Sequence, residues 1–134
     1  MCLNNWGGID HKVLEFHEYV NLFSGKSGSG KSTVMDAIQV ILYGSFSPSF
    51  LNKAADDAKN RRSVLSYLRG EQKDGSANRK DCDFCSVIAL EMEDTGTHII
   101  TCIGIAFEVR KSDSEIKKFV YFSHSGKMPE SEYL

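Results

Sequence analysis

The sequence predicts an α/β fold in which a glycine-rich loop leads into a helix and an antiparallel β meander follows. Two observations predict the first part: residues 25–30 carry three glycines, and residues 31–43 repeat apolar side chains at helical spacing. A third observation predicts the meander. From residue 86 onwards apolar and polar residues alternate, as in strands with one solvent-facing side.

The first 43 residues divide into two expected strands, the loop and the helix. Short apolar runs at 12–16 and 20–23 predict strands that neighbour each other. The helix is expected over 31–43, and Gly44 is suited to end it. Its shared apolar face is formed by Val34, Ile38, Ile41 and Leu42. Further apolar residues around the helix predict that it is largely buried.

The rest of the chain is expected to alternate between loops, short helices and strands. The non-strand segments are a loop at 45–52, a short exposed helix at 53–62, a helical turn at 63–68 and a mobile loop at 71–81. The expected strands are 88–93, 99–109 and 119–122. Turns at 94–97 and 110–115 join them.

The overall composition fits one ordinary globular domain. The chain has 134 residues, a formal net charge of -2 and 25% charged residues. This weakly acidic balance excludes a uniformly basic nucleic-acid binder. The sequence contains neither a signal-peptide pattern nor an apolar run long enough to span a membrane. We therefore expect a cytoplasmic protein with no membrane partner.

Two of the four cysteines form a C-x-x-C pair, Cys82 and Cys85. A structural zinc site needs a second pair of ligands at similar spacing, and the sequence offers none. A redox pair is expected at the start of a helix, whereas this one precedes a strand-like run. The pair is interpreted as two small residues that enter a strand.

The segment 25–32 matches the phosphate-binding motif G-x-x-x-x-G-K-[ST] at every specified position. Gly28 and Gly30 permit backbone conformations that let successive N–H groups curl around phosphate oxygens. Lys31 adds a positive charge for the β- and γ-phosphates, and the Ser32 hydroxyl is a hard ligand for Mg²⁺. The predicted ligand is MgATP. Its predicted contact residues are Ser27, Gly28, Ser29, Gly30, Lys31, Ser32 and Thr33, with Lys31 as the catalytic group.

Beyond the loop, the sequence resembles the N-terminal ATPase half-head of the SMC-like family, which includes SMC, SbcC and MukB-type proteins. Asp-Ala-Ile at 36–38 and Leu-Tyr-Gly at 42–44 carry this resemblance, together with Tyr-Leu-Arg-Gly at 67–70. The match looks nearest to MukB-like ATPases of the MksF and JetC type. It spans most of the chain but is specific mainly at 20–44 and 63–70.

The resemblance implies an ABC-type head, of which this chain is the N-terminal lobe. In such proteins two heads sandwich ATP, and the ATP state is coupled to DNA loading or looping in chromosome maintenance, repair or plasmid defence. The implied partners are the C-terminal half-head of the same chain, a second head and DNA, with a nucleoid-associated location. Arg69 would contact DNA or sense bound nucleotide.

The sequence departs from this family because parts of the ATPase are missing. There is no strand that ends in Asp-Glu, and Val87–Leu90 followed by Glu91 is a poor imitation of one. A signature motif and heptad repeats are also missing. Residues 1–134 are therefore expected to be the N-terminal part of a head. Without a catalytic glutamate, the chain is expected to bind MgATP with negligible turnover.

Three alternatives remain open. The loop also fits a transporter-type ABC ATPase, although Asp-Ala-Ile and Leu-Tyr-Gly disfavour it, and Gln72 lies in a polar loop rather than at a strand end. A small P-loop kinase or GTPase is second, and Asn52-Lys53 lacks the Asp of a guanine-specific motif. The third is a non-catalytic module. Residues interpreted as structural or solvated are Trp6, Asp36, Lys53, Lys59, Arg61 and Arg62.

Overall fold

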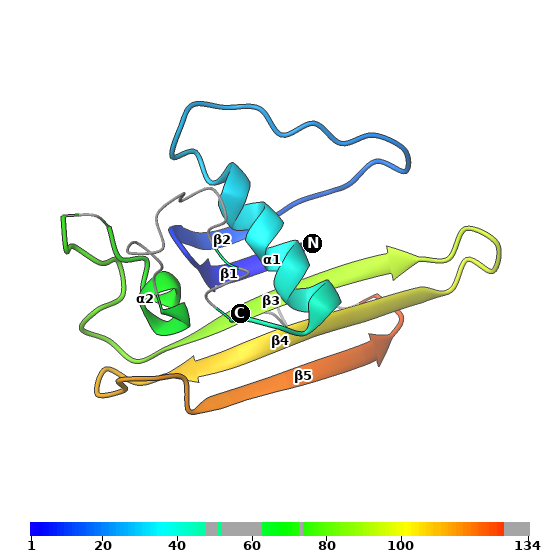
Figure 1. Ribbon diagram of the computed structural model, residues 1–134. Helices are drawn as coiled ribbons and strands as arrows, with labels where there is room; N and C mark the ends of the chain where they lie inside the picture. The colour runs from blue at the N-terminus through cyan, green and yellow to red at the C-terminus, as the bar shows by residue number, and fades with distance from the viewer. Residues whose placement is uncertain (48–50, 52–62, 73, 128–134) are drawn as a thin grey trace.

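The computed structural model describes residues 1–47, 51, 63–72 and 74–127. Its elements, in chain order, are β1 (Cys2–Trp6), β2 (Ile9–Val13), α1 (Lys31–Tyr43), α2 (Val64–Leu68), β3 (Phe84–Glu93), β4 (Ile100–Val109) and β5 (Lys118–Ser125). Five strands form a single sheet, and both helices lie on one side of it (Figure 1).

The sheet is antiparallel throughout, with strand order β2-β1-β3-β4-β5. Strands β3, β4 and β5 follow one another in sequence and in space, and they are the strands expected in the last third of the chain. Strand β3 is longer than predicted at its start and β5 at both ends, because cross-strand pairing extends regular structure past the alternating apolar core, whereas β4 begins one residue later than predicted. An antiparallel sheet after α1 is therefore present, as predicted.

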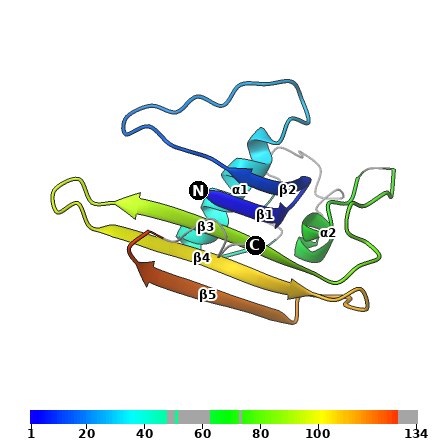
Figure 2. The ribbon, with the colours of Figure 1, turned by 180° about the vertical axis from the view of Figure 1, so that it is seen from behind.

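Helix α1 begins and ends at the predicted residues, and Gly44 terminates it in the left-handed region with φ 61°. It lies across the sheet face on which Leu3, Ile88 and Ile105 are buried (Figures 1 and 2). The apolar face predicted for α1 is buried at Val34 and Ile41 and half-buried at Ile38, whereas Leu42 is exposed, and the helix is buried on the side that faces the sheet. Its outer side exposes three large apolar side chains, those of Met35, Leu42 and Tyr43.

The core beneath α1 is organised around Trp6, which is completely buried. Its ring centroid lies 4.8 Å from that of Tyr67 on α2 and 6.5 Å from that of Phe107 on β4. Aromatic pairs at these separations add to the free energy gained by burying their surface. The interpretation of Trp6 as a core residue is confirmed, and the residue joins both helices to the sheet.

Of the two strands predicted before the glycine-rich loop, the first overlaps β2 only at residues 12–13, and the second is wrong. The hairpin is formed by β1 and β2, and the long segment 14–30 contains neither helix nor strand; it arches away from the sheet in Figure 1. The expected strand 20–23 has no strand partner among the described residues, and the Leu22 side chain is 88% exposed. Apolar composition alone does not make a strand, because the backbone groups also need a partner.

Helix α2 confirms the helical turn expected at 63–68. The Ser63 side chain caps it by accepting a hydrogen bond from the Ser66 backbone N–H at 3.1 Å. The helix expected at 53–62, half of the loop at 45–52 and the four basic residues between 53 and 62 lie outside the described residues. Within the described part of the chain, no helix is long and apolar enough to cross a membrane.

The predicted loop at 71–81 is fastened to the sheet by one buried side chain, Arg79. Its guanidinium donates hydrogen bonds to the carbonyl oxygens of Gly7 and Leu68, and it forms an ion pair with Asp10 at 2.6 Å. Burial lowers the pKa of Arg79, and the Asp10 carboxylate partly opposes that change. Arg79 therefore ties the β1–β2 turn to the C-terminal end of α2.

Replacing Gly104 with alanine should destabilise the sheet. An added Cβ would lie 2.3 Å from the Phe122 ring and 2.5 Å from the Ile88 carbonyl oxygen, so the ring and the backbone would both have to shift. Overpacking of this kind costs about 1–3 kcal/mol in unfolding free energy. Urea denaturation measures it. Gly96→Ala is the matched control, because its nearest contact is an ordinary 3.4 Å, and it should change stability by less than about 0.5 kcal/mol.

Candidate nucleotide-binding site

The glycine-rich loop turns sharply in front of α1. Gly28 and Gly30 have φ values of 82° and 88°, in the left-handed region that disfavours side chains. The Ser29 backbone N–H closes a turn by donating to the Lys26 carbonyl oxygen at 3.2 Å. The loop is therefore wrapped rather than extended, and its conformation favours glycine at Gly30, which the motif specifies, and at Gly28, which it leaves open.

The Lys31 side chain folds back into this loop. Its Nζ atom donates hydrogen bonds to the carbonyl oxygens of Gly25 at 2.6 Å and Lys26 at 2.8 Å. It also lies 3.2 Å from the Ser29 hydroxyl oxygen. A positive charge thus sits inside a ring of backbone atoms at the N-terminus of α1, where the helix dipole also favours an anion.

The N-terminal end of α1 is held against β1. The Trp6 indole N–H donates a hydrogen bond to the Thr33 carbonyl oxygen at 2.9 Å. Gly7 packs so closely that an added Cβ would lie 3.0 Å from the Thr33 methyl group. One turn further along, buried Asp36 accepts a hydrogen bond from the Tyr67 hydroxyl at 3.2 Å. Asp36 therefore has the packing role expected of it, and Ser32 stays exposed at the helix start.

A pocket of about 250 Å³ lies directly beside the loop. Gly28, Ser29 and Gly30 form one wall, and the β1–β2 turn at Gly7 and Gly8 forms the second. The third wall is the segment that leaves α2, including Glu71 and Gln72. Sequence reasoning missed the second and third walls because these segments lie far from the motif in sequence and carry no motif of their own.

The residues present fit a magnesium nucleoside triphosphate. The loop offers backbone amides around residues 28–32, Lys31 would hold the β- and γ-phosphates, and the Ser32 hydroxyl would hold Mg²⁺. The bound metal would supply neutralisation of phosphate charge. The adjacent pocket has room for part of a nucleoside.

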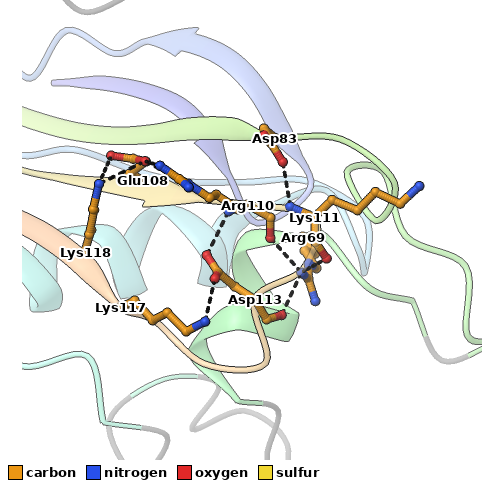
Figure 3. Close-up of polar contacts among 8 residues, drawn as sticks. All are labelled: Arg69, Asp83, Glu108, Arg110, Lys111, Asp113, Lys117 and Lys118. Carbon is orange, nitrogen blue, oxygen red and sulfur yellow. Dashed lines mark hydrogen bonds and ion pairs between the residues drawn. The ribbon is translucent and has the colours of Figure 1, made fainter.

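Arg69, the predicted DNA-contacting or nucleotide-sensing residue, lies at the C-terminal end of α2 and faces the β4–β5 turn (Figure 3). Its Nη2 atom donates to three backbone carbonyl oxygens, those of Arg110 at 3.2 Å, Lys111 at 3.1 Å and Asp113 at 3.0 Å. One nitrogen is shared among these acceptors, so Arg69 fastens the turn to α2.

The β4–β5 turn is further organised by carboxylates. The Asp113 carboxylate accepts the Arg110 backbone N–H at 2.9 Å and pairs with Lys117 at 3.0 Å, and these two contacts hold the pKa of Asp113 below its usual value (Figure 3). On β4, the Glu108 carboxylate pairs with Lys118 and Arg110, which lowers its pKa in the same way. The basic side chains of this turn are thus partly neutralised.

The C-x-x-C pair lies at the N-terminal end of β3. Cys82 and Cys85 are exposed free thiols, and Cys85 lies in β3, so the pair enters a strand as interpreted. Across residues 1–47, 51, 63–72 and 74–127, no group of three or more His, Cys, Asp or Glu side chains is placed to hold a metal ion.

Comparison with known proteins identifies the class of this site. Residues 1–58 match the family described as the P-loop containing region of AAA domain. The chain is also 33% identical over 72 residues to the SbcC component of the nuclease SbcCD from Staphylococcus haemolyticus (strain JCSC1435), covering 51% of this chain and 6% of that protein. The N-terminal region is thus that of an SMC-like, SbcC-type P-loop ATPase, which confirms the resemblance. The finer likeness to MksF and JetC remains a prediction.

Replacing Arg69 with alanine should loosen the β4–β5 turn. The three carbonyl oxygens would lose a charged donor, and hydrogen bonds of this kind contribute about 1.5–3 kcal/mol. We expect faster amide hydrogen exchange within residues 110–117 and a lower free energy of unfolding. Lys80→Ala removes a positive charge from an exposed position in the loop between α2 and β3 and serves as the control. Unchanged exchange in the Arg69 variant would contradict the fastening role.

Proposed function

We propose that this chain binds MgATP through residues 25–33 and forms the N-terminal lobe of an ABC-type, SMC-like ATPase head. The observation that carries the proposal is the wrapped loop, with left-handed Gly28 and Gly30 around the Lys31 ammonium at the start of α1. In this proposal Ser27, Ser29 and Thr33 add contacts to the phosphates. Similarity to a component of SbcCD favours this function over a transporter-type ATPase.

A partner that completes the head is part of the proposal. Exposed apolar side chains gather on the segment before the loop, at Tyr19, Val20 and Leu22, and on the outer side of α1. Exposed apolar groups of this size are typical of surfaces that bind another protein segment. We propose that the C-terminal half-head of the same protein covers them and supplies the missing catalytic glutamate.

In the assembled protein, two heads would close on ATP and couple its hydrolysis to DNA loading or looping in the cytoplasm, on the nucleoid. The name of the relative links it to a nuclease, which supports repair among the pathways considered. The chain spans only a small part of that relative's length, so support for this wider role comes from the shared N-terminal region alone.

Removal of the Lys31 charge tests the nucleotide site. Isothermal titration calorimetry of the 134-residue chain with ATP and Mg²⁺ should show binding, and Lys31→Ala should weaken it at least tenfold because a charged phosphate contact is lost. Lys127→Ala, an exposed lysine after β5, should leave the affinity unchanged. Equal affinities for the wild-type chain and the Lys31 variant would argue against the site.

Measurement of steady-state ATP hydrolysis distinguishes a chain that only binds ATP from one that also hydrolyses it. Because the sequence contains no Asp-Glu pair, we expect no steady-state ATP hydrolysis above the background of the Lys31→Ala variant. Addition of the C-terminal half-head should raise the rate. A rate typical of an intact ATPase from the 134-residue chain alone, abolished by Lys31→Ala, would show that the catalytic group lies within it.

A further inference from the structure

The pocket beside the P-loop has chemically different walls. On the wall formed by the loop, Gly28 and Gly30 bring the backbone close to the pocket, near the Lys31 ammonium. Another wall is formed by Glu71 and Gln72, which follow α2. The first wall therefore suits an anion, whereas the second carries a carboxylate that repels phosphate and accepts hydrogen bonds from hydroxyl groups.

Glu71 is held in place before any ligand binds. Its backbone N–H donates to the Ser66 carbonyl oxygen at 3.1 Å, and the Ser66 hydroxyl donates to its Oε2 atom. Glu71 also forms an isolated β-bridge with Ala77. A side chain fixed in this way loses little further conformational entropy when a ligand binds.

The glycine before Glu71 sets the shape of this wall. Gly70 is buried with φ 66°, and a Cβ there would lie 2.8 Å from the Gly7 carbonyl oxygen. The same carbonyl accepts a hydrogen bond from Arg79. The chain leaving α2 is thus pressed against the β1–β2 turn, and both segments line the pocket together with the P-loop.

We propose that Glu71 is a specificity-determining residue that accepts hydrogen bonds from the ribose hydroxyl groups of the bound nucleoside triphosphate. The proposal rests on nucleotide binding at the P-loop as proposed above. With the phosphates on residues 28–32, the sugar would extend along the pocket towards the carboxylate, where a ribose with two adjacent hydroxyls can donate to both oxygens. The site would then prefer ribonucleotides to 2′-deoxyribonucleotides.

Calorimetry with three Mg²⁺-bound ligands tests this assignment: ATP, dATP and inorganic tripolyphosphate. The wild-type chain should bind dATP about tenfold more weakly than ATP, the effect of one hydrogen bond to a charged group. Glu71→Gln is nearly isosteric and can still accept from Ser66. It should weaken ATP about tenfold, weaken dATP less because dATP keeps only the 3′-hydroxyl, and leave tripolyphosphate within about twofold of the wild-type value.

The control variant is Glu93→Gln, which removes a glutamate charge at the C-terminal end of β3, away from the residues that line the pocket. It should alter none of the three affinities, and thermal unfolding of both variants checks that they are folded. Equal affinity of the wild-type chain for ATP and dATP would overturn the assignment. This comparison can be made without any variant. So would a Glu71 variant that binds all three ligands more tightly, since Glu71 would then face the phosphates.

The two proposals fail in different ways. If ATP and tripolyphosphate bind and depend on Lys31, but Glu71→Gln affects ATP and dATP alike, only the role of Glu71 is lost. If neither ATP nor tripolyphosphate binds, both the nucleotide site and the ribose contact are overturned.

Discussion

The attachment of α1 to β1 is the contact on which the candidate site depends. Trp6 is buried beneath the helix, and its indole N–H reaches the Thr33 carbonyl oxygen two residues after Lys31. This single side chain therefore fixes where the helix begins relative to the sheet. Because the glycine-rich loop ends at that point, the position of Lys31 follows from a core contact rather than from the loop itself.

Two arginines extend this arrangement to the rest of the molecule. Arg79 joins the β1–β2 turn to the end of α2, and Arg69 joins the same end of α2 to the β4–β5 turn. Both donate to backbone carbonyl oxygens in turns and at a helix end, which is a stabilising use of a buried or half-buried guanidinium. Gly70 and Glu71, which form part of the pocket wall, lie between Arg69 and Arg79 in the sequence.

The elements that were predicted correctly have local signals. The bounds of α1 follow from the glycines on either side of it, and β3 and β4 follow from strict alternation. The failure at 20–23 has the opposite cause, since a strand is defined by a partner that no local pattern specifies. The pocket was missed for a similar reason: Gly7, Gly28 and Glu71 meet only after the chain has folded.

Helix α2 has only five residues, and a helix of that length has no stability of its own in water. It is stabilised by the tertiary structure around it, because Tyr67 packs against Trp6 and the arginines near its C-terminal end bond to neighbouring turns. The third wall of the pocket therefore depends on the tertiary structure around α2. A peptide that contains the glycine-rich loop and α1 alone would keep the motif yet lack half of the cavity beside it.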